Sequence, residues 1–223
     1  MVQRKRPAPT TALTNGYTVE NNRTIWTIGH STRSQEEFLA ALHSFRIEVL
    51  VDVRRYPGSK KYPQFNATAL AAYLPETGIG YLPEVELGGR RKPKPNSANT
   101  AWKSESFRGY ADYAETAAFA AGIAKLTAVG ALQRTAYMCS EAVWWRCHRA
   151  IISDYLKASG WTVRHIMKEG VATEHPYTSA FRETHPRYSS AEGEGNPRIS
   201  EGYYTKQENF PRQRPAGFAA LRE

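Results

Sequence analysis

The first part of the chain alternates between short apolar runs and stretches in which apolar residues recur at helical spacing. Residues 24–28 form an apolar run that predicts a strand closed by a glycine, and residues 49–53 form a second one. Between them, Ser34 and Glu37 have the spacing of a helical capping box, and the apolar residues of 38–45 follow at helical intervals. We therefore expect a strand, a helix and a strand in this order.

The same alternation continues to about residue 166. It predicts a helix over 66–78, a strand over 79–82, a long loop over 88–108, a helix over 109–129, a strand over 135–138, a helix ending at Gly160 and a last strand over 161–166. This order favours an α/β fold, a Rossmann-like three-layer sandwich around a mainly parallel sheet of about five strands. We expect a disordered basic arm (1–23), a single α/β domain (24–170) and an irregular C-terminal extension (171–223).

Polar residues follow several predicted strands, and the carboxyl ends of parallel strands meet at one edge of a sheet. Two carboxylates, Asp52 and Glu141, can act as general acid or base, although Asp52 can instead pair with an arginine and Glu141 can stabilise a helix start. With them, His30 and Cys139 are our candidate catalytic residues. The candidate substrate-binding residues are Ser31, Arg54, Gly89, Arg90, Ser140, His148 and Arg149.

The two cysteines allow several interpretations. Cys139 ends a strand before a helix start, where a nucleophilic thiolate can form, yet a buried cysteine can also be inert. Cys139, Cys147 and His148 are possible metal ligands but lack the spacing of a zinc ribbon, so we assign no metal. Because the chain has neither a nicotinamide-type nor a P-loop glycine motif, we expect no cofactor.

The composition excludes several protein classes. Two cysteines cannot form a disulfide-rich scaffold, and no apolar run reaches the roughly 20 residues that span a bilayer. No apolar segment of a secretion signal follows the basic N-terminus. We therefore expect a cytoplasmic protein with no membrane partner.

The net charge of +9 indicates an anionic partner. Residues 54–108 hold most of the excess, with ten basic and four acidic residues, and aromatic residues are interleaved with them. Such a mixture suits a nucleic-acid strand, whose phosphates contact the cations and whose bases contact the rings. The candidate nucleic-acid-binding residues are Arg55, Lys60, Lys61, Arg91 and Lys92.

Five short motifs together resemble one known family. They are Gly-His-Ser at 29–31, Asp-Val-Arg at 52–54, Leu-Gly-Gly at 87–89, Cys-Ser-Glu at 139–141 and Cys-His-Arg at 147–149. In this order they are similar to the family catalogued as domain of unknown function 488, over about residues 24–170. The resemblance implies a single α/β domain and these motif positions, and it implies no reaction type.

Three functions remain open. The first is a hydrolase or transferase that acts on a nucleotide or nucleic acid, with a phosphate-binding pocket at the carboxyl edge of the sheet. The second is a nucleic-acid-binding module without catalysis. The third is a sulfurtransferase with Cys139 as nucleophile, because residues 50–54 and a cysteine at a strand end resemble rhodanese-like enzymes.

Overall fold

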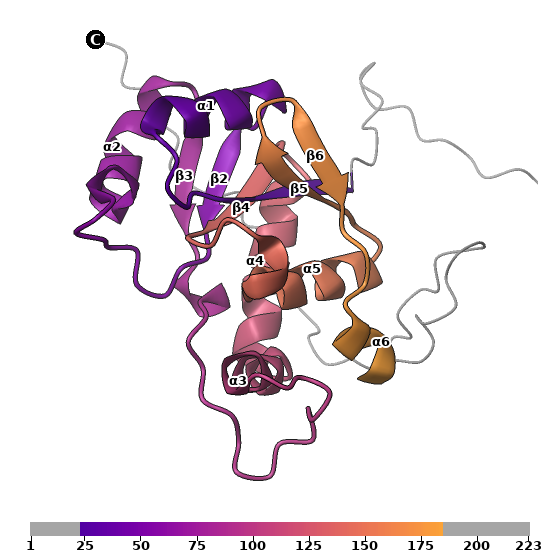
Figure 1. Cartoon of the computed structure of the whole chain (residues 1–223). Coiled ribbons are helices and arrows are strands. Elements are labelled where there is room, and N and C mark those ends of the chain that lie inside the picture. Colours follow the sequence, from indigo (N-terminus) through magenta and orange to yellow (C-terminus); the bar gives the residue numbers. More distant parts are fainter. Residues whose placement is uncertain (1–22, 185–223) are drawn as a thin grey trace, which may run out of the picture.

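The fold is an α/β sandwich built on one six-stranded sheet, in a computed structural model that describes residues 23–184 (Figure 1). The strand order is β3-β2-β4-β1-β5-β6, with β1 to β5 parallel and β6 antiparallel to β5. The strands are β1 (Thr24–Gly29), β2 (Val49–Asp52), β3 (Gly80–Pro83), β4 (Thr135–Cys139), β5 (Thr162–Lys168) and β6 (Val171–Glu174).

Within residues 23–184, six α-helices and three short 3₁₀ turns connect and cover the strands. The helices are α1 (Gln35–Ser44), α2 (Ala67–Glu76), α3 (Glu105–Ala114), α4 (Ala117–Gly130), α5 (Arg149–Ala158) and α6 (Ser179–Thr184). The 3₁₀ turns are η1 (Pro63–Phe65), η2 (Val85–Leu87) and η3 (Trp144–Arg146). No helix within residues 23–184 has the length and apolar character needed to cross a membrane.

Two predicted helix boundaries follow directly from local chemistry. The capping box at α1 is confirmed, because the Ser34 hydroxyl accepts from the Glu37 amide at 3.2 Å and the Glu37 carboxylate accepts from the Ser34 amide at 2.9 Å. Gly160 follows α5 with a φ of +85°, a left-handed conformation that ends a helix and favours glycine.

Successive side chains along each strand point to opposite faces of the sheet, so the core has two layers. This confirms the predicted three-layer sandwich. Ile25 and Val163 point to the face that packs against α3, α4 and α5. Trp26, Ile28 and Leu50 point to the opposite face, which packs against α1 and α2. The sheet is therefore buried on both sides, as a parallel sheet requires.

The structure differs from the sequence prediction in three places. Helix α3 begins at Glu105, inside the predicted loop 88–108, and the predicted helix 109–129 is two helices. The break arises because Thr116 caps α4, accepting a hydrogen bond from the Phe119 amide. The sheet has a sixth strand, and β6 and α6 lie in a segment that we expected to be irregular.

The strand order places a crevice at the carboxyl end of β4. Its neighbours β1 and β2 are followed by helices on one face, whereas β4 is followed by α5 on the other face. Loops that diverge from adjacent strands leave a crevice between them, where ligands bind in open α/β sheets. The predicted arm, over residues 1–22, and residues 185–223 of the predicted extension lie outside the described residues.

Candidate functional site

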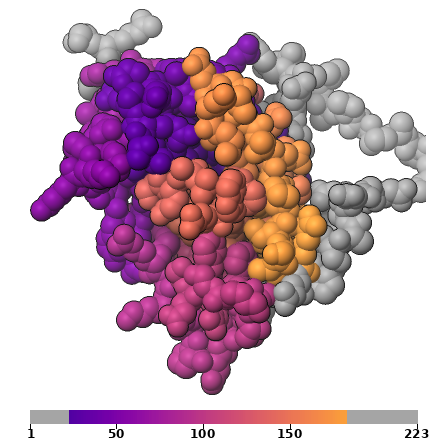
Figure 2. All heavy atoms as spheres, in the orientation of Figure 1, coloured from indigo at the N-terminus to yellow at the C-terminus, as the bar shows by residue number. Residues whose placement is uncertain are grey.

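A cavity of about 500 Å³ lies at this crevice and is lined by residues that follow β1, β2 and β4. In Figure 2, the atoms of the segment after β4, in salmon, adjoin indigo atoms from the start of the described chain and orange atoms from its end. Ten residues that we selected from the sequence line the cavity: His30, Ser31, Arg54, Arg55, Gly89, Arg90, Cys139, Ser140, Glu141 and His148.

Asp52 does not line the cavity but lies buried behind Arg54. Its carboxylate accepts hydrogen bonds from Nε of Arg54 at 2.8 Å, from Nη2 at 2.6 Å and from the hydroxyl of Tyr81 at 2.7 Å. The Arg54 guanidinium also donates to the Phe65 carbonyl. This arrangement matches the second of our two interpretations of Asp52, pairing with an arginine, and the carboxylate thereby positions Arg54 in the cavity wall.

His30 is a neutral, buried ring in the same wall. Its Nε2 lies 3.2 Å from Nη1 of Arg54, which can only donate, so Nδ1 carries the proton and donates to the Ser31 carbonyl. The ring is stacked on Phe65 with centroids 4.3 Å apart. Burial and the Arg54 charge lower the pKa of His30 to about 4, so the ring offers a neutral polar atom and not a cation to a ligand.

Glu141 lies beside the two cysteines at the floor of the cavity. The Cys139 thiol donates to Oε2 of Glu141 at 3.0 Å. Burial raises the pKa of the Glu141 carboxyl, but hydrogen bonds from Cys139 and Cys147 outweigh burial, and the pKa lies below its ordinary value. An ionised carboxylate suits the base role more than the acid role.

The two thiols ionise unequally. The neighbouring Cys147 sulfur and burial hold the pKa of Cys139 well above its ordinary value. Burial also raises the pKa of Cys147, but the hydrogen bond from Cys139 and the positive charge of Arg149 outweigh it and lower the pKa. Of the two cysteines, Cys147 is therefore the one with a lowered thiol pKa, and we did not select it as catalytic from the sequence.

His148 faces both sulfurs from the start of α5. Its Nδ1 lies 3.9 Å from Sγ of Cys139 and 3.6 Å from Sγ of Cys147. Its Nε2 lies 3.1 Å from the Val53 carbonyl, which can only accept. Gly89 leaves room for the ring, because a Cβ atom on Gly89 would lie 2.9 Å from Nδ1.

Arg149, a predicted substrate-binding residue, is 1% exposed and does not line the cavity. Its guanidinium donates to the Thr27 hydroxyl at 3.0 Å and to the Glu141 carbonyl at 2.6 Å. Gly29 allows the Glu141 carbonyl to lie close to the end of β1, since a Cβ atom on Gly29 would collide with that carbonyl. Within residues 23–184, no carboxylate forms an ion pair with Arg149.

A buried network of aromatic and polar side chains fixes the loop between β4 and α5 against β5 and α5. Trp144 stacks on His165 of β5, and Nε2 of His165 lies 2.9 Å from Nδ1 of His175. Nε2 of His175 in turn lies 3.0 Å from the Asp154 carboxylate of α5. These contacts join the loop, β5 and α5, and so fix the residues that precede Cys147.

The mouth of the cavity is cationic and aromatic. Arg55 and Arg90 both lie over the ring of Tyr56, at 5.6 and 5.8 Å from its centroid, and Arg146 lines the cavity from η3. The other predicted nucleic-acid-binding residues lie outside the lining: Lys60, Lys61, Arg91 and Lys92. Of these, Arg91 lies 3.6 Å from the centroid of the Tyr113 ring and donates to the Gly88 carbonyl.

Ten lining residues were not among our candidate catalytic, substrate-binding or nucleic-acid-binding residues: Thr32, Tyr56, Gly58, Ser59, Tyr62, Ser106, Phe107, Tyr110, Arg146 and Cys147, the last of which we named only as a possible metal ligand. Arg146 stands directly before the Cys-His-Arg motif at 147–149, so extending that motif by one residue would have found it. Ser106, Phe107 and Tyr110 carry no such local signal, because they reach the cavity from α3 and its first turn.

Comparison with known proteins gives one family. The family model of the domain of unknown function DUF488 matches residues 34–156, more than half of the chain. No curated protein and no solved structure matches the chain. The matched residues include β2 and β4, the loops at their carboxyl ends and most of α5. The family predicted from the five motifs is thereby confirmed, and the chain belongs to the DUF488 family.

Proposed function

We propose that this protein is a hydrolase or transferase that acts on a nucleotide or nucleic-acid substrate in the cavity at the carboxyl edge of the sheet. One observation carries the proposal: an ionised carboxylate, Glu141, lies at the floor of a cavity whose mouth holds Arg55, Arg90 and Arg146. Within the described residues, none of these three arginines forms an ion pair, so their charges are available to a substrate anion.

The aromatic side chain between the cations supports a substrate that carries a base as well as phosphate. Tyr56 is 63% exposed and lies beside both Arg55 and Arg90. Rings next to cations are the usual means of holding a base and its phosphate without reading sequence. Lys60, Lys61, Arg91 and Lys92 extend the positive charge beyond the cavity, which suits a strand longer than one nucleotide.

In this proposal the acidic and basic residues have different roles. Glu141 accepts the proton of the attacking group, because its carboxyl is ionised at neutral pH. The arginines at the mouth hold phosphate oxygens. Arg54, already paired with Asp52, and neutral His30 shape the wall of the cavity without adding a free charge.

The sulfurtransferase alternative receives less support. A nucleophilic cysteine requires a lowered thiol pKa, whereas burial and Cys147 raise that of Cys139. Moreover, the ionised carboxylate of Glu141 accepts a hydrogen bond from the Cys139 thiol and would repel a negative charge on that sulfur.

The test uses the full chain with ATP, a short single-stranded RNA and a short single-stranded DNA, and product formation is followed by chromatography. Wild type should convert at least one of these substrates, and Glu141→Gln should lose turnover while its binding is nearly unchanged. Glu76→Gln, on the exposed end of α2, is the matched control and should retain wild-type turnover. Salt-dependent binding with no turnover by wild type would instead identify a binding module.

A further inference from the structure

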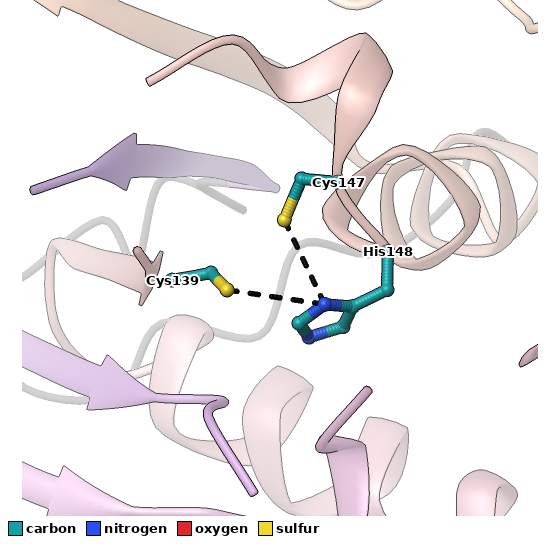
Figure 3. A group of neighbouring side chains, drawn as sticks. All are labelled: Cys139, Cys147 and His148. Carbon is teal, nitrogen blue, oxygen red and sulfur yellow. Dashed lines mark hydrogen bonds between the residues drawn. The ribbon is translucent and has the colours of Figure 1, made fainter. Parts of the chain in front are cut away.

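We propose that Cys139, Cys147 and His148 bind a zinc ion at the floor of the cavity, with the fourth coordination position open to a water or substrate. Figure 3 shows the three side chains converging from the end of β4 and the start of α5. The proposal concerns the site itself and does not depend on which substrate the cavity binds.

The donor atoms lie close to the separations that tetrahedral zinc requires. With Zn–S and Zn–N bonds of about 2.3 and 2.0–2.1 Å, a tetrahedral ion holds sulfur and nitrogen about 3.5 Å apart and two sulfurs about 3.8 Å apart. Here Nδ1 of His148 lies 3.6 Å from Sγ of Cys147 and 3.9 Å from Sγ of Cys139. All three donor atoms lie within 4.8 Å of one another, so small side-chain rotations complete the triangle.

The imidazole of His148 is oriented as a ligand. The Val53 carbonyl can only accept, so Nε2 of His148 carries the proton and Nδ1 directs its lone pair at the sulfurs. Proteins commonly fix a metal-binding histidine in this way, with the second ring nitrogen donating to a carbonyl or carboxylate. The absent side chain of Gly89 leaves the space that this ring orientation occupies.

Cysteine binds metal as the thiolate, and the ion itself displaces the thiol protons on binding. Cys139 and Cys147 are 4% and 3% exposed, and Arg149, two residues after Cys147, places an uncompensated positive charge beside Cys147, since no carboxylate in the described part of the chain pairs with it. Two thiolates and one imidazole are soft and borderline donors, which select zinc over magnesium or calcium.

The remaining coordination position faces the cavity. Both cysteines and His148 are lining residues, as is Glu141, whose Oε2 lies 3.0 Å from Sγ of Cys139. Three protein ligands and an open position distinguish catalytic zinc sites from closed structural ones. A water bound there would have its pKa lowered by the ion, and Glu141 is placed to accept its proton.

The experiment measures metal content. Full-length protein without a histidine tag is purified under reducing conditions and analysed by inductively coupled plasma mass spectrometry. Wild type should hold about one zinc ion per chain, while Cys139→Ser, Cys147→Ser and His148→Ala should fall to background. His43→Ala, which removes an exposed histidine of α1, is the matched control and should retain the zinc.

A second measurement covers the case in which a variant fails to fold. Cobalt added to zinc-free wild type should give the near-ultraviolet absorption of a thiolate–cobalt bond, and stoichiometric zinc should abolish that absorption. Wild type that holds no zinc, even after zinc is added back, overturns the proposal, as do folded variants that hold as much zinc as wild type. Because neither measurement uses turnover, its result is separate from that of the Glu141→Gln experiment.

Discussion

The indole ring of Trp144 lies flat on the imidazole ring of His165, with centroids 4.4 Å apart and planes inclined by 7°. This contact joins the loop after β4 to β5, which lies on the far side of β1 in the sheet. Burial and the charges of His175 and Arg149 lower the pKa of His165 to about 2. The ring is therefore neutral in the folded protein.

The first prediction is a loss of stability at acidic pH that depends on His165. An unfolded histidine has a pKa near 6.5, so below this value the unfolded state binds a proton that the folded state excludes. The contribution of His165 is thus present above pH 6.5 and is lost progressively as the pH falls toward 2, at about 1.4 kcal/mol per pH unit.

Urea unfolding between pH 8 and pH 5 measures this effect. His165→Gln should flatten the pH dependence of the free energy of unfolding by about one proton relative to wild type. His43→Gln, on the exposed side of α1, is the control and should keep the wild-type slope. Equal slopes for wild type and His165→Gln would show that His165 is not held neutral.

The second prediction concerns the buried ion pair between Asp52 and Arg54. Asp52→Asn leaves the Arg54 guanidinium buried without its countercharge and should lower the free energy of unfolding by about 3–5 kcal/mol. Glu174→Gln, which breaks an exposed pair with Lys157, should cost at most about 1 kcal/mol. Chemical denaturation of both variants checks the contrast, and similar losses would contradict the positioning role of Asp52.

The third prediction concerns Gly29, whose bare Cα lets the Glu141 carbonyl and the Arg149 guanidinium meet. Gly29→Ala forces the chain after β4 to move and should cost about 1–3 kcal/mol of stability. The same substitution at Gly58, where a Cβ would meet no atom within 4 Å, should be nearly neutral. Thermal melts of the two variants provide the comparison. A melting temperature of Gly29→Ala equal to that of wild type would rule out the close approach of the Glu141 carbonyl to Gly29.

The fourth prediction addresses the cations at the mouth of the cavity. Arg55→Gln and Arg90→Gln should each weaken binding of a single-stranded oligonucleotide and reduce the salt slope of log K by about 0.7 for each phosphate that the variant no longer neutralises. Arg46→Gln, just before β2 at the opposite edge of the sheet, should leave both quantities unchanged. Fluorescence anisotropy across a salt series measures them, and identical slopes in all three variants would remove these arginines from the binding surface.

Much of the fold could be predicted because its signals are local. The apolar runs at 24–28, 49–53 and 135–138 and the capping box at Ser34 each lie within a few residues. The cavity residues after β1, β2 and β4 followed from one rule of parallel sheets, that strands end together at the edge where ligands bind. Strand β6 was not predicted because its four residues are mostly exposed and show no apolar run. It lies at the edge of the sheet and pairs with β5 alone.

The sequence predicted many residues of the site but not what each of them contacts. Arg149 has the sequence context of an anion-binding residue, and its burial against Thr27 and the Glu141 carbonyl depends on contacts 122 and 8 residues away. Likewise, the spacing of Cys139 and Cys147 matches no zinc ribbon, because a strand end and a helix start bring the sulfurs together. The decisive hydrogen bond, from His148 to Val53, spans 95 residues.

The position of β1 between β4 and β5 has a consequence for synthesis of the protein on the ribosome. Gly29 pairs with Cys139, so β1 emerges about 110 residues before its first partner in the sheet. At usual elongation rates this interval lasts about 5–20 s, during which an apolar strand has no neighbour. The nascent chain must therefore keep residues 24–29 from aggregating until β4 is made, and the cavity floor is completed only when α5 has followed.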